Sequence, residues 1–364
     1  MSISLFRSDR VERLVEKLAD LMQKNPQQNI FLPTEILIAS DGMKHFINLS
    51  LAQELGVAAN IRYSKVHSFF WRILYESNKK QIKPFRHCYA PEILQWQILN
   101  IFQSDKMPVT VKNAVNNYLK SHDTAAYGLS QTMAKLFEQY MIYRPDWIRV
   151  WSKNQLMGDL GKDEEWQKDL WRAIRERMGN QNRVELLDDL LDKLKNKTIS
   201  FRLPERVFVF AAGALSPLYL QLFNALSQHT HIHLLVLSPS CAYWGDARKN
   251  DPDANPLLVS LGGQSRDFFD LLNEINFDED DESFTEDEIS SSCTLLYRVQ
   301  YAIRHYQPLE NIEKTTPDNS IVLHSAYSPL RELHAVKDAI LYFLEENPQY
   351  PIFFSYQRFV LTHY

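Results

Sequence analysis

EILIASDGMKHF, at residues 35–46, passes from an apolar strand pattern through a short polar turn into a helical pattern. It predicts a strand from Glu35 to Ala39 and a helix from about Met43 to Glu54, which Gly56 stops. Upstream, Ser2–Phe6 has a strand pattern, and Ser8 or Asp9 can cap a helix. The apolar face of that helix is Val11, Leu14, Val15, Leu18, Leu21 and Met22, and an extended stretch at 59–66 follows the second helix. Strands that alternate with single helices predict a parallel sheet with crossover helices.

The pattern changes between residues 65 and 200, where helical periodicity dominates at 90–102, 130–141 and 164–178. Alternation of strand and helix returns after Pro204. A strand is predicted at 207–211, a helix begins at Ser216 with Pro217 in its first turn, and a strand follows at 231–237. We therefore predict an α/β fold in which a large all-helical insertion interrupts a parallel-sheet domain.

An acidic run crosses residues 278–288, where eight carboxylates more than account for the net charge of −5 of the whole chain. Such a run indicates a solvated linker. After it, Ser320–Ser325 and the helix that begins at Ser328 resemble the start of another α/β unit. The predicted division is 1–64, first part of the α/β domain; 65–200, helical insertion; 201–277, second part; 278–318, acidic linker; 319–364, start of a second, truncated α/β domain. Because the last residues lead to a short terminus, we expect a truncated or frame-altered product.

The turn at residues 39–44 and a second stretch, VFVFAAGALSP at 207–217, have the layout of the phosphate and metal loops of a nucleotide-hydrolysing motor. A phosphate cradle needs several glycines and a lysine followed by Ser or Thr, whereas Gly42 is alone and His45 follows Lys44. Ala211 and Ala212 occupy the places where a motor needs an acidic pair that holds magnesium. The two loops predict a motor fold without ATP hydrolysis.

Composition excludes several other classes of protein. The chain has no run of about 18 apolar residues and no apolar leader, so we expect a cytoplasmic protein that does not enter the membrane. Its cysteines, Cys88, Cys241 and Cys293, are odd in number and widely spaced, which argues against disulfides and cysteine metal sites.

Candidate metal and catalytic groups are few. His229, His231 and His233 fall on one face of a strand and could bind a metal, although partly exposed strand histidines explain them better. Carboxylate pairs such as Glu164 with Glu165 lie in helical patterns and are assigned to helix surfaces. We therefore expect no catalytic residue and no metal site in this chain.

The stretch from Arg62 to His87 mixes basic and aromatic residues and contains one acid, Glu76. Basic groups neutralise phosphates, and aromatic rings stack on unpaired bases with roughly 1–3 kcal/mol each. The stretch could therefore line a groove for single-stranded nucleic acid. Alternatively, Phe69, Phe70 and Ile73 are helix core and the lysines face solvent.

Several motifs together carry a resemblance to a known family. They are DGM at 41–43, GVAANI at 56–61, SFFW at 68–71, LFEQY at 136–140, YRPDW at 143–147, YWGD at 243–246, NPLL at 255–258 and SPLRE at 328–332. With them, the chain resembles the gamma subunits of exodeoxyribonuclease V, the RecC family, in their N-terminal portion. The resemblance covers nearly the whole chain to about Glu346.

This resemblance implies a superfamily 1 helicase-like domain that lacks ATPase residues and acts in DNA repair and recombination of double-strand breaks. The family assembles as a heterotrimer with a helicase-nuclease (beta) subunit and a helicase (alpha) subunit, which use the ATP and Mg²⁺. It binds single-stranded and double-stranded DNA, guides the 3′-terminated strand and recognises Chi. The alternative is a protein–protein assembly scaffold of the same complex that reads no DNA.

The resemblance also implies DNA-binding residues. Trp71, Leu136, Arg144 and Arg183 match the pattern, and Glu138 keeps an acidic group. A tryptophan can stack on a base, and arginines can pair with phosphates or with guanine edges. The positions that depart from the best-known members are Ala39, Asp41, His45, Lys65 and Lys135, so the preferred base sequence stays open.

Overall fold

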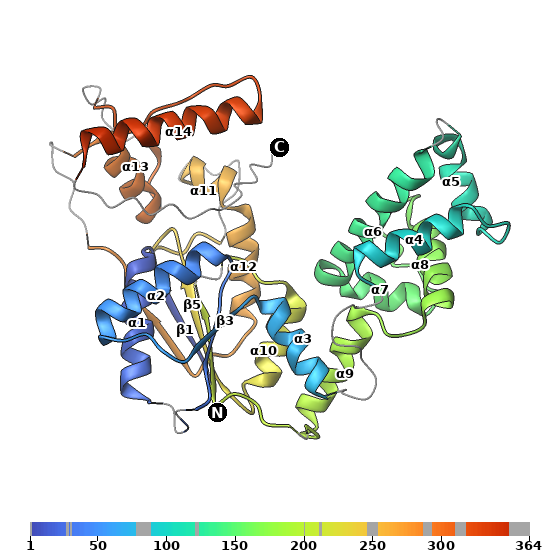
Figure 1. Cartoon of the computed structure of the whole chain (residues 1–364), viewed down its shortest axis with the longest axis horizontal. Helices are drawn as coiled ribbons and strands as arrows, with labels where there is room; N and C mark the ends of the chain where they lie inside the picture. The colour runs from blue at the N-terminus through green and yellow to red at the C-terminus, as the bar shows by residue number, and fades with distance from the viewer. Residues whose placement is uncertain are drawn as a thin grey trace. The chain divides into compact units, whose positions relative to one another are not determined.

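A computed structural model describes residues 2–26, 29, 31–77, 89–120, 124–199, 201–210, 213–245, 254–286, 293–309 and 318–348 (Figure 1). Six strands form one sheet, in the order β3-β2-β4-β5-β1-β6. Their bounds are β1 Ile3–Ser8, β2 Thr34–Leu37, β3 Ile61–Ser64, β4 Arg206–Phe210, β5 His231–Leu237 and β6 Glu279–Glu282. Constant offsets show that β1 runs parallel to β5, since the amides of Ile232 and Ser238 donate to the carbonyls of Ser2 and Ser8. The predicted parallel sheet is confirmed.

Helices connect these strands. They are α1 Val11–Lys24, α2 Asp41–Leu55, α3 Val66–Ser77, α4 Pro91–Phe102, α5 Val109–Leu119, α6 Ala125–Tyr143, α7 Pro145–Ser152, α8 Glu164–Met178, α9 Arg183–Lys195, α10 Pro217–Leu226, α11 Pro256–Leu261, α12 Gly263–Asn273, α13 Leu295–Arg304 and α14 Pro329–Glu346. Between β3 and β4, the described part of the chain contains helices α3 to α9 and no strand. Across the ranges that the structure describes, no helix has the length and apolar character that a bilayer crossing requires.

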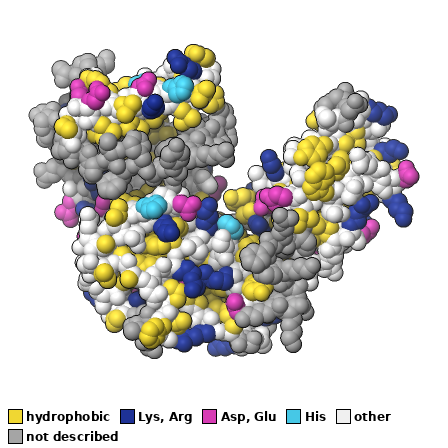
Figure 2. All heavy atoms as spheres, viewed as in Figure 1, with side chains coloured by type: hydrophobic (Ala, Val, Ile, Leu, Met, Phe, Trp, Pro, Cys, Tyr) yellow, Lys and Arg dark blue, Asp and Glu magenta, His cyan; other side chains and the backbone are white. Residues whose placement is uncertain are grey.

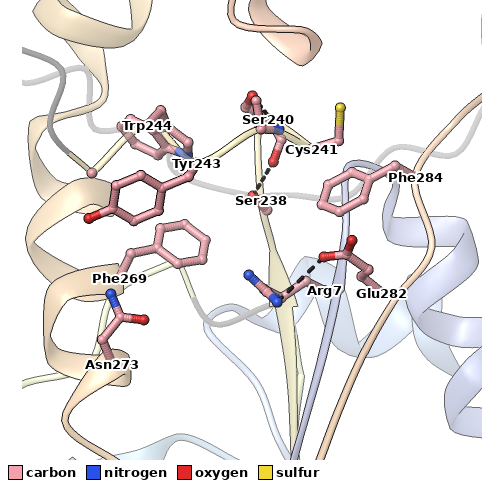
Figure 3. Close-up of a pocket in the computed structure, with 12 residues that line it drawn as sticks. Arg7, Ser238, Ser240, Cys241, Tyr243, Trp244, Phe269, Asn273, Glu282 and Phe284 are labelled. Atoms are coloured by element: carbon pink, nitrogen blue, oxygen red, sulfur yellow. Dashed lines mark hydrogen bonds and ion pairs between the residues drawn. The ribbon is translucent and has the colours of Figure 1, made fainter.

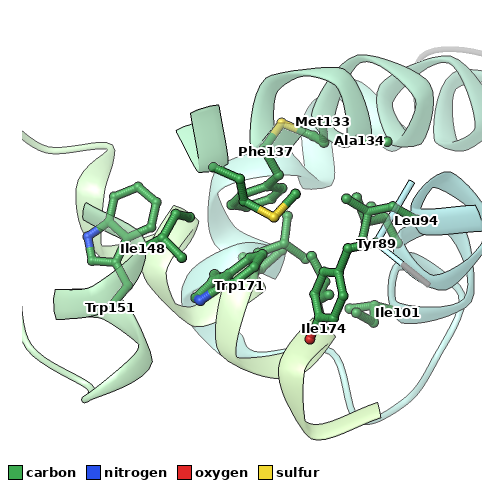
Figure 4. Close-up of a cluster of buried hydrophobic side chains, with 14 of the residues drawn as sticks. Tyr89, Leu94, Ile101, Met133, Ala134, Phe137, Ile148, Trp151, Trp171 and Ile174 are labelled. Atoms are coloured by element: carbon green, nitrogen blue, oxygen red, sulfur yellow. The ribbon is translucent and has the colours of Figure 1, made fainter. Parts of the chain in front are cut away.

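The chain divides into two compact units. The first contains Met1–Ser4, Ser64–Val207 and Leu215–His233. Its helical core packs side chains from α4, α6, α7 and α8, among them Phe137, Trp151 and Trp171 (Figure 4). These large rings supply the apolar area that a helical bundle must bury. Over α4 and α6, hydrophobic side chains also gather at the surface (Figure 2), where the rings of Trp96 and Tyr127 lie 5.7 Å apart.

The second unit contains Leu5–Tyr63, Phe208–Ala214 and Leu234–Tyr364. Its core joins apolar residues of β1, β2, β4 and β5 to α1 and α2, which lie side by side (Figure 1). Helix α2 begins at Asp41, before the predicted start at about Met43, because the Ser40 hydroxyl caps it by accepting a hydrogen bond from the Met43 amide at 3.4 Å. The helix ends at Gly56, whose φ of 77° favours glycine.

The acidic run differs from the expected solvated linker. Glu279–Glu282 forms the edge strand β6 beside β1, and α13 also lies within the range 278–318. The carboxylates are paired with cations: Arg7 contacts Asp280 at 3.1 Å, and Lys17 contacts Asp281 at 2.8 Å. Hydrogen bonding to Lys17 lowers the pKa of Asp281. Four consecutive acids form a strand here because the neighbouring strand and helix supply the opposite charge.

The last described segment also differs from the prediction. Residues 320–325 form no strand, whereas α14 begins at Ser328, whose hydroxyl accepts a hydrogen bond from the Arg331 amide. None of the residues of α14 is buried. The extended pattern at 320–325 lacks a partner strand among the described residues, and an isolated strand has no ladder to stabilise it.

Candidate nucleic-acid interface

Helix α3 explains both interpretations of the basic and aromatic stretch. Phe69, Phe70 and Ile73 are buried, as the core interpretation predicts, and the Phe70 ring stacks on Tyr219 at 5.5 Å with an interplanar angle of 7°. Trp71 lies on the flank of the same helix and is partly exposed. The helix therefore uses one side for packing and leaves the indole of Trp71 near the surface.

Arg183 lies against this indole. Its guanidinium carbon is 5.7 Å from the centre of the Trp71 ring, within the range of a cation–π contact. The sequence places Arg183 as the first residue of α9, after Asn182, whose side chain caps the helix. A cation at a helix N-terminus opposes the helix dipole, so this position is electrostatically unfavourable. Local rules of this kind are most often broken at functional sites.

Glu138 on α6 compensates part of that charge. Its carboxylate lies 3.6 Å from a guanidinium nitrogen of Arg183, and the two side chains are 33% and 13% exposed. The Nε of Arg183 is buried and has no hydrogen-bond partner among the described residues. Trp71, Arg183 and Glu138 thus form one cluster, which we name the α3–α6–α9 cluster.

The charges of this cluster also influence the pKa values of two further residues, Tyr219 and His67. Burial raises the pKa of Tyr219, while Arg183 acts to lower it and Tyr143 and Glu138 act to raise it. Burial also lowers the pKa of His67, and the positive charges of Arg183 and Lys65 lower it further. Burial and the two cations thus both disfavour the charged form of His67.

The other two predicted residues, Arg144 and Leu136, belong to the same unit and stand outside this cluster. Arg144 is exposed between α6 and α7, with its guanidinium 5.7 Å from the Trp147 ring and a 3.3 Å hydrogen bond to the Tyr143 carbonyl. Pro145 ends α6 there and begins α7, which presents Arg144 at the break. Leu136 is partly buried against the helical core. The structure therefore brings three of the five predicted residues together through direct contacts of Arg183.

Part of the predicted basic stretch is used for other contacts or lies outside the described residues. Arg62 pairs with the buried Glu35 at 2.9 Å, and Arg72 lies over the Phe69 ring at 5.5 Å. Lys79, Lys80, Lys83, Phe85 and Arg86 are outside the described residues. Among the departing positions, Ala39, Asp41, His45, Lys65 and Lys135 are all exposed.

The first of the two predicted loops has the expected strand–turn–helix form, from β2 to α2. Lys44 lies on α2 with its ammonium 6.0 Å from the centre of the Tyr63 ring. Burial raises the pKa of Tyr63 to about 12. At the second loop, β4 ends at Phe210 and α10 begins at Pro217, while Ala211 and Ala212 are outside the described residues.

His231 and His233 lie on β5, whereas His229 lies in the turn before it, so the three do not share a strand as predicted. All three are hydrogen-bonded. His231 contacts the Ser2 hydroxyl at 2.9 Å, and His233 contacts the Ser4 hydroxyl at 2.7 Å. His229 contacts the Leu194 carbonyl at 2.8 Å. Within the described ranges, no group of three or more His, Cys, Asp or Glu side chains could hold a metal ion. Cys241 and Cys293 are in the thiol form, and Cys88 lies outside those ranges.

Sequence reasoning missed Tyr219 and His67. Tyr219 lies in the apolar pattern of α10, far from the other cluster residues in sequence, so its position predicts core alone. His67 directly precedes the SFFW motif, and its closeness to Arg183 depends on the packing of α3 against α9. The basic residues beside the SFFW motif were the one sequence signal that could have pointed to His67.

Comparison with known proteins identifies the family. Residues 3–306 match the family model described as RecC, N-terminal domain. Among curated relatives, the chain is 27% identical to "RecBCD enzyme subunit RecC" of Escherichia coli (strain K12), covering 95% of this chain and 36% of that protein. Identity to the Haemophilus influenzae protein of the same name is 26%, and the match covers 94% of this chain and 37% of that protein. Identity to the Mycolicibacterium smegmatis protein of that name is 22%, and the match covers 96% of this chain and 32% of that protein.

The chain therefore spans about a third of the length of these relatives, at their N-terminal portion. The family match extends over both compact units, from β1 to the end of α13. This chain belongs to the RecC family, whose N-terminal domain it matches.

Proposed function

We propose that this chain is a non-catalytic DNA-handling part of a RecC subunit, which guides the 3′-terminated single strand and takes part in recognising Chi. In this proposal the α/β parts, 1–64 and 201–277, are a helicase-like body without ATPase residues, and the helices at 65–200 are its insertion. The α3–α6–α9 cluster is the observation that carries the proposal. It combines a partly exposed indole with a guanidinium that is held in place before DNA arrives.

The chemistry of the cluster suits an unpaired strand. Trp71 can stack on a base, and stacking tolerates every base because each has a π-face. Arg183 can contact a phosphate or the edge of a guanine, and its contact with Trp71 limits its rotamers. Arg144, exposed at the end of α6, adds a second cation for the phosphate backbone.

Fluorescence anisotropy of a labelled oligo(dT) with the 364-residue chain tests the proposal. Trp71→Ala should weaken binding by about 1–3 kcal/mol, the contribution of one stacked base. The matched control is Trp96→Ala, which removes an exposed indole of the same unit whose ring is tilted against that of Tyr127. Equal affinity of the Trp71→Ala variant and the unaltered chain, or an equal loss in both variants, would remove Trp71 from the interface.

The relatives are named as subunits of the RecBCD enzyme, so we also propose assembly with helicase-nuclease and helicase subunits. ATP hydrolysis, Mg²⁺ and cleavage belong to those subunits in this proposal, and the assembly acts in the cytoplasm. The purified chain should then hydrolyse no ATP in the presence of DNA. ATP hydrolysis by the chain alone that is lost in a Lys44→Ala variant would refute the assignment of hydrolysis to the partner subunits.

A purely structural role is the second candidate, and α14 favours it. This helix has no buried residue and exposes Leu330, Val336, Ile340, Tyr342 and Phe343, an apolar surface of the kind that contacts protein. If the chain is an assembly scaffold, Ile340→Glu should abolish co-purification with the partner subunits. Oligo(dT) affinity should then be equally low in the unaltered chain and in the Trp71→Ala variant.

A further inference from the structure

A cavity lies in the second compact unit, at the carboxyl end of β5. It holds about 200 Å³ and opens between α12 and the strands β1 and β6 (Figure 3). Its walls include Arg7, Tyr243, Trp244, Phe269, Glu282 and Phe284. In parallel sheets, ligands bind outside the carboxyl ends of the strands, which is where this cavity lies.

The volume limits what can enter. Sites for whole small molecules or cofactors enclose about 300–1,000 Å³. A cavity of 200 Å³ is too small for a nucleoside triphosphate and suits a single ring or one large side chain. Four aromatic walls favour an aromatic guest, because rings pack well at offset or edge-on angles.

The aromatic walls are held in place by close packing. The ring of Trp244 is 4% exposed and meets Phe269 edge-on at 5.9 Å. A side chain at Gly245 would collide with the Tyr243 ring, since a Cβ there would lie 2.6 Å from its hydroxyl oxygen. Glycine at this position lets the exposed Tyr243 ring fold over the loop and wall the cavity.

Arg7 contributes a cationic wall. One of its terminal nitrogens pairs with Asp280 at 3.1 Å and with Glu282 at 3.4 Å, and the other points toward Phe269 (Figure 3). Within the part of the chain that the structure describes, the buried Nε of Arg7 has no hydrogen-bond partner. The face of a guanidinium held by carboxylates stacks readily on an aromatic ring.

The rim of the cavity is acidic. Glu282 lines the cavity, and Asp280 contacts the same terminal nitrogen of Arg7; the side chains of Glu282 and Asp280 are 52% and 47% exposed. Ion pairs this exposed are weak, so the carboxylates can take a second cation at little cost. The same carboxylates repel phosphates, which makes a nucleic-acid strand an unsuitable occupant.

We propose that this cavity docks a protein partner, which inserts one aromatic side chain beside Tyr243 and Phe284 and places basic side chains on the carboxylates of β6. Charge complementarity with the rim and the ring-sized volume together define this occupant. The proposal concerns the second unit and does not depend on DNA binding by the α3–α6–α9 cluster.

Short peptides titrated into the 364-residue chain test it, with saturation-transfer NMR and calorimetry as readouts. The probe Ac-Lys-Tyr-Lys-NH2 should bind about tenfold more tightly than Ac-Lys-Ala-Lys-NH2, because the ring is lost in the second. It should also bind more tightly than Ac-Glu-Tyr-Glu-NH2 and weaken with added salt. Equal binding of the tyrosine and alanine peptides, or tighter binding of the acidic peptide, would overturn the proposal.

Two variants locate the binding. Asn273→Trp places a large ring at the exposed end of α12, where it lines the cavity, and should abolish binding of Ac-Lys-Tyr-Lys-NH2. The matched control is Asp267→Trp, which adds the same ring to an exposed position of α12 outside the cavity and should leave binding unchanged. Glu282→Gln keeps the size of the side chain and should weaken binding about two- to fivefold. Unchanged affinity in both Asn273→Trp and Glu282→Gln, or displacement of the peptide by oligo(dT), would refute the assignment.

Discussion

Replacing Glu138 with Gln should change stability and DNA affinity in opposite directions. Across the 3.6 Å to Arg183, the attraction between unit charges is about 4–5 kcal/mol at the effective dielectric of about 20 near a protein surface. Solvent and desolvation cancel most of it, because the two side chains are 33% and 13% exposed. We expect Glu138→Gln to lower the free energy of unfolding by about 0.5–1.5 kcal/mol.

The same substitution should strengthen binding of single-stranded DNA. Arg183 loses its carboxylate partner, so its charge becomes available to a phosphate. Affinity for oligo(dT) should rise about two- to fivefold. The slope of log K against log salt should become steeper by about 0.7, the value for one more phosphate contact on a single strand.

Thermal unfolding and fluorescence anisotropy over a salt series measure the two effects. The matched control is Glu165→Gln, which removes one exposed carboxylate from α8 and makes the same change in net charge. A rise in affinity of equal size in the control would show a long-range charge effect. Weaker binding by Glu138→Gln, or an unchanged salt slope, would refute the assignment of Arg183 to the strand-binding surface.

Three further predictions concern stability. Glu164→Gln should lower the free energy of unfolding by about 1.5–3 kcal/mol, because the buried carboxylate accepts hydrogen bonds from Trp151 Nε1 and two backbone amides. Burial acts to raise the pKa of Glu164, but these hydrogen bonds lower it overall. The stability that the carboxylate contributes should therefore be present above its unfolded-state pKa and be lost as pH falls through its folded-state pKa. Acid titrations followed by circular dichroism measure this loss. Gly262→Ala should cost about 1–3 kcal/mol in chemical denaturation, since its Cβ would lie 2.4 Å from a backbone carbonyl oxygen and 2.8 Å from the Trp244 ring. The raised pKa of Tyr63, about 12, means that the folded state keeps its phenol proton longer, so stability should fall as pH rises from the ordinary value of 10 toward 12 in ultraviolet titrations.

Local patterns in the sequence predicted the inner strands and the helices α1, α2, α4, α6, α8, α10 and α14. Helix α8 has the predicted bounds Glu164–Met178, because its apolar spacing and terminal Gly179 agree with one another. Strand β6 was missed because four consecutive acids show no alternation of apolar and polar residues. It forms through charges on Arg7 and Lys17, whose nearness depends on the tertiary fold.

The candidate site was less accessible from local patterns. Nothing in their spacing predicts that Trp71 and Arg183 approach to 5.7 Å, because packing of α3 against α9 brings them together. The family resemblance supplied these two residues and Glu138. It did not supply Tyr219, which lies on the apolar helix α10 and whose pKa is influenced by Arg183 and Glu138.

The edge strand β6 is fastened to its neighbours mainly by polar contacts. Arg7 and Lys17 contact its carboxylates, Arg13 bonds to Ser283 just beyond it, and the amide of Ser283 donates to the carbonyl of Arg7. Inner strands are buried instead among apolar side chains, whose packing changes little with ionic strength. The outermost strand should therefore loosen gradually as electrolyte is added while the rest of the sheet stays closed. The attachment of this edge strand to the sheet should therefore depend on the ionic strength of the solution.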